Sequence, residues 1–157
     1  MTLEHLHSLK SLTTISENSI HLWPEPIEQN LALGHLFDSW ASMHPSLNPN
    51  GVWNEIVSRG MSEGFYVGSG LLLPHVRIPD VDKAFLAFGV CPSGFTGVKK
   101  KLEEPATMMC LLLSPEKNPM THIYVIKHIA QKLMDSSWKE RVLQALDTFE
   151  IKHLLLD

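Results

Sequence analysis

Gly68-Ser69-Gly70-Leu71-Leu72-Leu73-Pro74-His75-Val76-Arg77 is the stretch of sequence that decides the fold. A glycine-rich turn leads into a short apolar run, the run ends at Pro74, and His75 follows at once. The run predicts a buried strand that ends on His75, and α/β proteins place ligand contacts at the carboxyl ends of such strands. From this pattern two interpretations stay open: a histidine that merely ends a strand, and a chemically active imidazole at the edge of a sheet.

The segments around this stretch predict strands that alternate with helices. Continuous apolar runs at 84–90 and 107–113 are typical of strands covered on both faces, and 19–23 alternates polar and apolar residues like a strand. We expect one helix from Pro26 to Met43 and another from Pro119 to Leu133. Between them, a short helix is expected from Val52 to about Gly60–Gly64, after a cap at Asn48 or Asn50. A capping box at Ser137 opens a last helix, with Leu146 and Phe149 on its apolar face. The sequence therefore predicts one three-layer α/β domain over residues 17–157, preceded by an arm or peripheral helix at 1–16.

Composition and charge exclude several classes of protein. The chain has 157 residues and a formal net charge of −4, with acids and bases spread along it, so no basic block points to nucleic acid. Its two cysteines form neither a disulfide framework nor a zinc spacing. The start lacks a signal-peptide core, and no apolar run approaches the roughly 20 residues of a membrane span. We expect a cytoplasmic protein that does not insert into a membrane.

Nine histidines are present, and His75 and His122 differ from the others in placement. His5 and His7 near the start give only a weak metal signal, because a zinc site needs three or four ligands. His122 follows Asn118-Pro119, a plausible cap and first position of a helix, and it continues that helix's apolar stripe towards the sheet. Backbone N–H groups at a helix start favour an anion. His122 is therefore either a packed histidine or part of a phosphate site.

Phosphohistidine chemistry fits these residue types. A neutral imidazole is nucleophilic near pH 7, and an acceptor at its other nitrogen must fix the tautomer. Positive charge and positioning do most of the catalysis of phosphoryl transfer, and Arg59 and Arg77 are candidate charges. The sequence has no Walker loop or kinase signature, so the phosphoryl source would not be a nucleotide bound here. No cofactor and no metal are expected.

The run from Arg59 through Gly68–Arg77 resembles the active-site motif of the enzyme IIA domains of the phosphoenolpyruvate-dependent phosphotransferase system, of the mannitol/fructose and nitrogen-regulatory (Ntr) type. The resemblance continues through Phe88-Gly89, Gly97, 104–113, Pro115 and Thr121-His122, and it covers roughly residues 17–150. It implies a mixed, mostly parallel sheet between helices. It also implies that His75 accepts a phosphoryl group from the phosphocarrier HPr or its nitrogen-branch relative, that His122 and Arg59 assist, and that Gly68, Ser69, Gly70 and Arg77 surround the site.

The same resemblance implies partners and leaves functions open. The acceptor would be an enzyme IIB, or the domain would regulate a transporter, kinase or transcription factor, as Ntr-type members do. This sequence departs from the family pattern at Gly60, where a glutamate is common, at Gly64-Phe65 in place of a Ser-Thr pair, and at Leu72 in place of a small residue. A binding module with little transfer activity is a further interpretation. A metal-dependent hydrolase built on His75 and His122 lacks an acidic ligand at a recognisable spacing.

Overall fold

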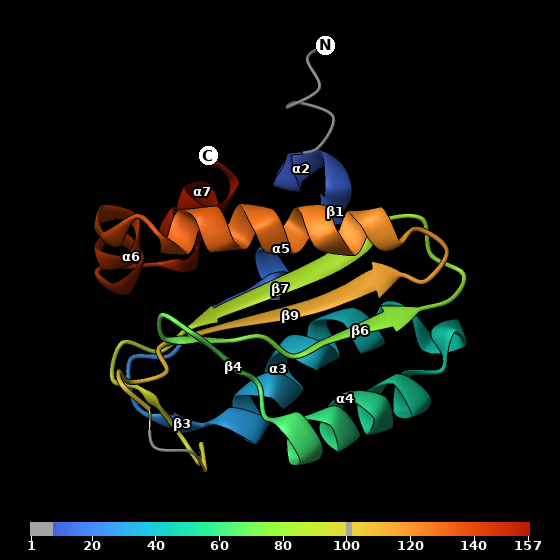
Figure 1. The fold of residues 1–157 in the computed structure, drawn as a ribbon, viewed down its shortest axis with the longest axis horizontal. Coiled ribbons are helices and arrows are strands. Elements are labelled where there is room, and N and C mark those ends of the chain that lie inside the picture. The colour runs from blue at the N-terminus through green and yellow to red at the C-terminus, as the bar shows by residue number, and fades with distance from the viewer. Residues whose placement is uncertain (1–7, 100–101) are drawn as a thin grey trace.

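A computed structural model describes residues 8–99 and 102–157 and shows a sheet between two layers of helices (Figure 1). Strands β7 and β9 are antiparallel neighbours at the centre; β5 and β6 run parallel to β9, and β1 and β2 run parallel to β7. The edge strand β4 is antiparallel to β5. This arrangement confirms the expected mixed, mostly parallel sheet. The seven strands are β1 (Thr13–Thr14), β2 (Ile20–Leu22), β4 (Tyr66–Gly68), β5 (Leu71–Leu72), β6 (His75–Ile78), β7 (Ala84–Val90) and β9 (Met108–Pro115).

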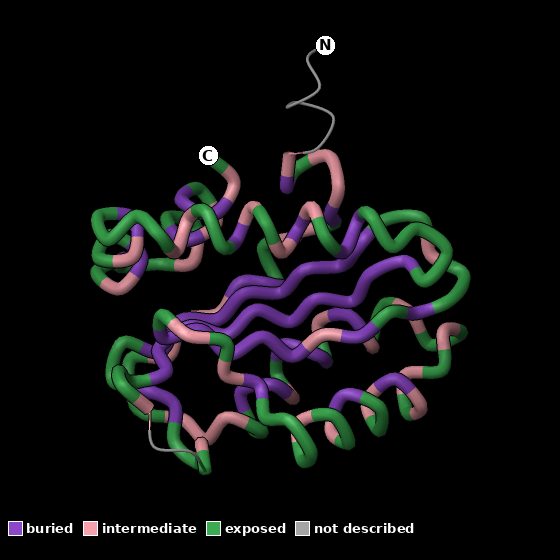
Figure 2. Tube along the Cα trace, in the orientation of Figure 1, coloured by how far each residue is buried: buried purple, intermediate pink, exposed green. Residues whose placement is uncertain are grey.

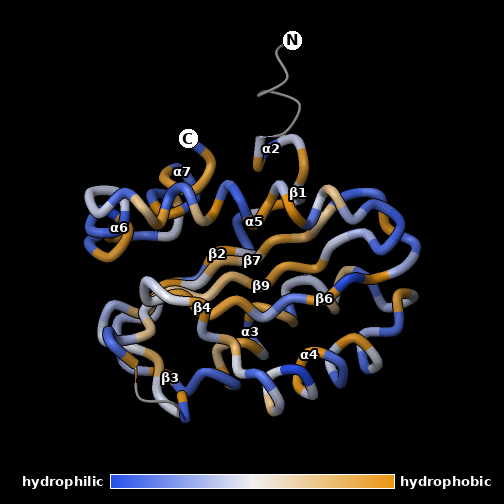
Figure 3. Tube along the Cα trace, viewed as in Figure 1, coloured by the Kyte–Doolittle hydropathy of each residue, from blue (hydrophilic) through white to orange (hydrophobic). Residues whose placement is uncertain are grey.

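The two central strands are buried along their whole length (Figure 2). Alternate residues of a strand point to opposite faces, so Leu86 and Phe88 join one hydrophobic cluster while Phe85 and Ala87 join another. Both faces of the sheet thus carry apolar side chains, which is why 84–90 and 107–113 are unbroken apolar runs (Figure 3).

Helices cover both faces of this sheet. On one face lie α3 (Gln29–Ala41) and α4 (Pro49–Glu63); on the other lie α5 (Pro119–Leu133), α6 (Ser136–Leu143) and α7 (Thr148–Leu156) (Figure 1). Asn48 caps α4 by accepting from Gly51 N, and Gly64, at φ +74°, ends it. Single turns of 3₁₀-helix occupy Glu17–Ser19 (η1) and Pro45–Leu47 (η2).

Helix α3 begins later than the sequence predicts. Ile27–Glu28 forms strand β3, which pairs in parallel with β8 (Phe95–Thr96) as a small second sheet. The Glu28 carboxylate then accepts a hydrogen bond from Leu31 N and caps the helix. The expected start at Pro26 is therefore wrong, because pairing with β8 holds the first residues extended.

The prediction of a single last helix is also wrong. Asp135, not Ser137, caps α6, since its carboxylate accepts from the N–H groups of Ser137 and Trp138. The chain then turns, and a second carboxylate at Asp147 caps α7 by accepting from Glu150 N. As a result Leu146 and Phe149 are not on a buried face: they are 89 % and 72 % exposed.

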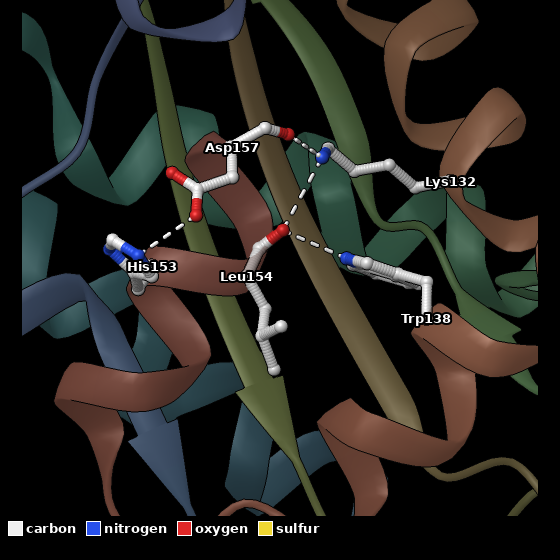
Figure 4. A network of polar contacts seen from close by, with 5 residues as sticks. All are labelled: Lys132, Trp138, His153, Leu154 and Asp157. Carbon is white, nitrogen blue, oxygen red and sulfur yellow. Dashed lines mark hydrogen bonds and ion pairs between the residues drawn. The ribbon is translucent and has the colours of Figure 1, made fainter.

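A polar network ties the end of α7 to α5 and α6 (Figure 4). Lys132 Nζ donates to the backbone oxygens of Leu154 and Asp157, at 3.3 and 2.5 Å, and Trp138 Nε1 donates to the same Leu154 oxygen at 2.8 Å. His153 contacts the Asp157 carboxylate at 2.9 Å. Burial lowers the pKa of Lys132, and the nearby Asp157 raises it in part. The network supplies partners for backbone oxygens at a helix end.

The described part of the N-terminal segment belongs to the folded body. Residues 1–7 lie outside the described residues; α2 (Leu9–Leu12) follows them, and β1 pairs with β7. Leu9 is buried in the cluster on the α5 face. Residues 8–16 thus contribute a short helix and a strand to the folded body. None of the described helices is long and apolar enough to cross a membrane.

Candidate functional site

Strands β5 and β6 are one interrupted strand beside β9. Leu71 pairs with Met108 and His75 pairs with Leu112, so the same offset of 37 residues holds on both sides of the interruption. Pro74 lacks an N–H group, and its oxygen still accepts from Leu112 N. His75 therefore begins β6, whereas the sequence predicted that it ends a strand. The alternation of His75, Val76, Arg77 and Ile78 continues the strand beyond the proline.

The His75 ring is held by the backbone two residues earlier. Its Nδ1 lies 2.8 Å from the Leu73 oxygen. A carbonyl oxygen only accepts, so Nδ1 carries the hydrogen, and the neutral ring keeps its lone pair on Nε2. The ring is half-buried. His75 thus presents a nucleophilic nitrogen in a fixed orientation.

His122 lies in the first turn of α5 with its ring against the sheet, as the apolar stripe predicts. It is 9 % exposed, and its Nδ1 is 2.8 Å from Oγ of Ser114, a fully buried residue of β9. The ring centroids of His75 and His122 are 5.2 Å apart, at an interplanar angle of 41°. Burial, followed by His75 and the charges of Arg77 and Arg59, lowers the pKa of His122 to about 4. His122 is therefore neutral at physiological pH.

Two arginines add positive charge to this pair of imidazoles. Arg77 is exposed two residues after His75, so it projects from the same face of β6. Arg59 lies on α4, where its guanidinium donates to the Glu55 carboxylate at 3.1 Å and both side chains are about half exposed. Both guanidinium charges contribute to the lowered pKa of His122.

The structure does not bring the Gly68-Ser69-Gly70 turn to the imidazoles. All three residues have positive φ angles, 102°, 54° and 78°, as the sharp link between β4 and β5 requires. The turn precedes Leu71, which lies four residues before His75 on the strand, a separation of about 13 Å. Gly70 N donates to the Tyr66 hydroxyl, and a Cβ atom on Gly70 would lie 3.1–3.3 Å from atoms of Pro105, Thr107 and Lys139. In this structure the turn shapes the sheet edge and makes no contact with the two rings.

Gly60 and Phe65, two of the residues that depart from the family pattern, contact each other. A Cβ atom on Gly60 would lie 2.3 Å from the Phe65 ring, so Gly60 leaves the space that Phe65 fills. The Phe65 oxygen accepts from Leu73 N at 2.8 Å, and the Leu73 oxygen in turn holds His75. Leu72 is fully buried in the cluster beneath. Phe65 thus supports the backbone that orients His75, and Gly60 leaves room for the Phe65 ring.

The remaining described histidines lie elsewhere, with partners of their own. His21 stacks on Trp23 and bonds the Asn18 oxygen, and His44 bonds the Trp40 oxygen. His128 lies half-buried on α5. Within the described residues, no group of three or more His, Cys, Asp and Glu side chains could hold a metal ion. His5 and His7 lie outside those residues.

Sequence reasoning did not find Ser114. It ends an apolar strand eight residues before His122, and a polar residue in that place is a weak signal, because strands often end in one. Its contact with His122 follows from the return of the chain from β9 into α5, which no local pattern specifies.

Solved structures of similar fold come from both branches of one system. Nitrogen regulatory protein IIA-Ntr from Neisseria meningitidis superposes with a TM-score of 0.71 at 20 % identity, covering 94 % of this chain and 98 % of that one. IIA mannitol from Escherichia coli gives 0.71 at 19 % identity, with 90 % and 99 % covered. A complex of enzyme IIA mannitol with phosphorylated enzyme IIB mannitol, also from Escherichia coli, gives 0.72 at 18 % identity, with 92 % and 98 % covered.

A family model places the sequence more specifically than these folds do. The model described as the phosphoenolpyruvate-dependent sugar phosphotransferase system, EIIA 2, matches residues 13–157. The match includes both histidines, both arginines and Ser114. The chain therefore belongs to the EIIA 2 family of the phosphoenolpyruvate-dependent sugar phosphotransferase system.

Proposed function

We propose that this protein is a phosphoryl carrier that accepts its phosphoryl group on Nε2 of His75 from phosphorylated HPr or the nitrogen-branch relative of HPr. One observation carries the proposal: the hydrogen bond from His75 Nδ1–H to the Leu73 oxygen, which leaves the Nε2 lone pair available. Membership of the family supports it.

The transfer follows from this arrangement. The Nε2 lone pair forms the bond to phosphorus while the bond from phosphorus to the donor protein breaks, and the donor keeps that electron pair. The His75 ring becomes more positive, and the Leu73 oxygen stabilises it through the retained Nδ1–H. Arg59 and Arg77 stabilise the phosphoryl oxygens, as charges do when the transferred group is nearly free in the transition state.

Transfer to the purified protein tests this proposal. Incubation with phosphoenolpyruvate, enzyme I and HPr is expected to give an acid-labile adduct on the wild type and none on His75→Ala. His35→Ala is the control, because His35 is an exposed histidine on α3, a helix that covers the opposite face of the sheet from α5. An adduct that survives in His75→Ala, or no adduct on the wild type, contradicts the proposal. The second outcome would favour a binding module with little transfer activity.

We further propose that the role is regulatory, as in Ntr-type proteins, with the state of His75 controlling contact with a transporter, kinase or transcription factor. The fold likeness to IIA-Ntr supports this branch, and the likeness to IIA mannitol in complex with IIB supports sugar transport as the alternative. Pull-downs with His75→Asp and His75→Ala separate the two. A partner that distinguishes these variants supports regulation, whereas passage of the phosphoryl group to an enzyme IIB supports transport. The cytoplasmic location stays a prediction.

A further inference from the structure

We propose that Ser114 is a positioning residue for phosphoryl transfer: its hydroxyl donates to His122 Nδ1 and so keeps the hydrogen of the neutral His122 ring on Nε2, where it serves the phosphoryl group on His75. This role rests on the proposed function, and it assigns to Ser114 a part that neither the sequence pattern nor the family resemblance suggests.

The contact is buried and short. Ser114 has no exposed surface, and its Oγ lies 2.8 Å from His122 Nδ1. Ser114 pairs with Arg77 across β6 and β9, two positions along from the pair formed by His75 and Leu112. The Ser114 hydroxyl therefore reaches Nδ1 of His122 from β9, the strand that pairs with the His75 strand β6.

The direction of this hydrogen bond follows from the hydrogens available. A hydroxyl has one hydrogen, and a buried O–H without an acceptor is unfavourable. Among the described residues, 8–99 and 102–157, the Ser114 side chain has one hydrogen-bond partner, which is His122. If Nδ1–H donated to Oγ, the hydroxyl hydrogen would be left without an acceptor in a closed site. Donation from Ser114 to Nδ1 uses that hydrogen.

The consequence is that the two imidazoles carry opposite tautomers. At His75 a carbonyl, which only accepts, holds the hydrogen on Nδ1 and leaves Nε2 as a nucleophile. At His122 a hydroxyl donates to Nδ1 and leaves Nε2–H as a donor. A lone pair on His122 Nε2 would repel the phosphoryl oxygens, whereas an N–H group there binds them. The partner of Nδ1 in each ring thus decides the role of Nε2, which is a nucleophile in His75 and a hydrogen-bond donor in His122.

Nitrogen-15 NMR of histidine-labelled protein at pH 7.5 tests the tautomer without any transfer. The expected result for the wild type is Nδ1–H at His75 and Nε2–H at His122. In Ser114→Ala the His122 signals are expected to shift towards the Nδ1–H form. Ser19→Ala is the matched control, because Ser19 is equally buried and donates to the Ser16 oxygen. Nδ1–H at His122 in the wild type would overturn the proposal, and this measurement stands even where Ser114→Ala does not fold.

Transfer rates complete the test. Phosphorylation of His75 by phosphorylated HPr is expected to slow about 10-fold or more in Ser114→Ala, since a misplaced donor loses part of its stabilisation of the transferring group. Because Ser114 acts through His122, the double variant with His122→Ala is expected to be no slower than His122→Ala alone. If the losses of transfer rate from the two substitutions multiply in the double variant, the positioning role of Ser114 is overturned. If the wild type accepts no phosphoryl group, the proposed function itself fails, and the tautomer result remains as a separate fact about the resting site.

Discussion

Lowering the pH is expected to destabilise this protein through His122. Its folded-state pKa is about 4 and its ordinary value is 6.5, so the unfolded chain binds the proton more tightly. The stabilising contribution is therefore present above pH 6.5 and is lost as the pH falls from 6.5 towards 4. At pH 5 the unfolded imidazole is almost fully protonated and the folded one is about one-tenth protonated, which corresponds to about 2 kcal/mol. Partial solvent access at the 9 % exposed ring brings the expected loss to about 1–2 kcal/mol.

Urea unfolding of the wild type and His122→Asn at pH 8 and pH 5 measures this contribution. Asparagine is neutral throughout and places a polar atom where His122 Nδ1 meets Ser114, so other titrating groups cancel in the difference between the two proteins. The wild type is expected to lose about 1–2 kcal/mol more than the variant between these pH values. Equal losses in both proteins would refute the reasoning, because they would place the His122 pKa near that of an exposed histidine.

Burial raises the pKa of the Cys110 thiol to about 12, so a thiol reagent at pH 8 is expected to label Cys110 only as fast as the protein unfolds, and fast labelling of the native protein would contradict this. Gly60→Ala is expected to cost about 1–3 kcal/mol in urea unfolding, because the new Cβ would overlap the Phe65 ring. The same change in a Phe65→Ala background is expected to cost much less, and a full additive cost would argue against the contact. Lys132→Met keeps the apolar stem but removes two hydrogen bonds to the end of α7, so a loss of about 1–3 kcal/mol is expected. Lys127→Met, at an exposed position on the same helix, is the control and should change stability little.

The centre of the fold could be predicted from the sequence because its signals are local and redundant. The runs 84–90 and 107–113 became β7 and β9, since a strand covered on both faces needs apolar residues at every position. The stripe beginning at His122 placed its ring against the sheet, because helical periodicity fixes which side chains share a face. These two inferences sufficed to anticipate the layers and one half of the site.

Other features depend on contacts between distant segments. The last helix divides because Asp147 caps a second one, and the apolar Leu146 and Phe149 gave a false continuation of the pattern. The glycine turn is adjacent to His75 in the printed sequence, yet an extended strand carries the two apart. Ser114 meets His122 only after the chain reverses from β9 into α5. The periodicity of apolar residues does not predict a contact of this kind between two segments.

The hydrogen bond from His75 to the Leu73 oxygen has a genetic consequence. Every amino acid at position 73 supplies the same carbonyl, so no amino-acid substitution there deletes the group that orients the His75 ring. The partner of His122 is a side chain, which one codon change can remove. Mutation can therefore change the hydrogen-bond partner of His122 while His75 keeps its own. Under the proposed function, substitutions at position 114 would change the rate of transfer and leave acceptance on His75 intact.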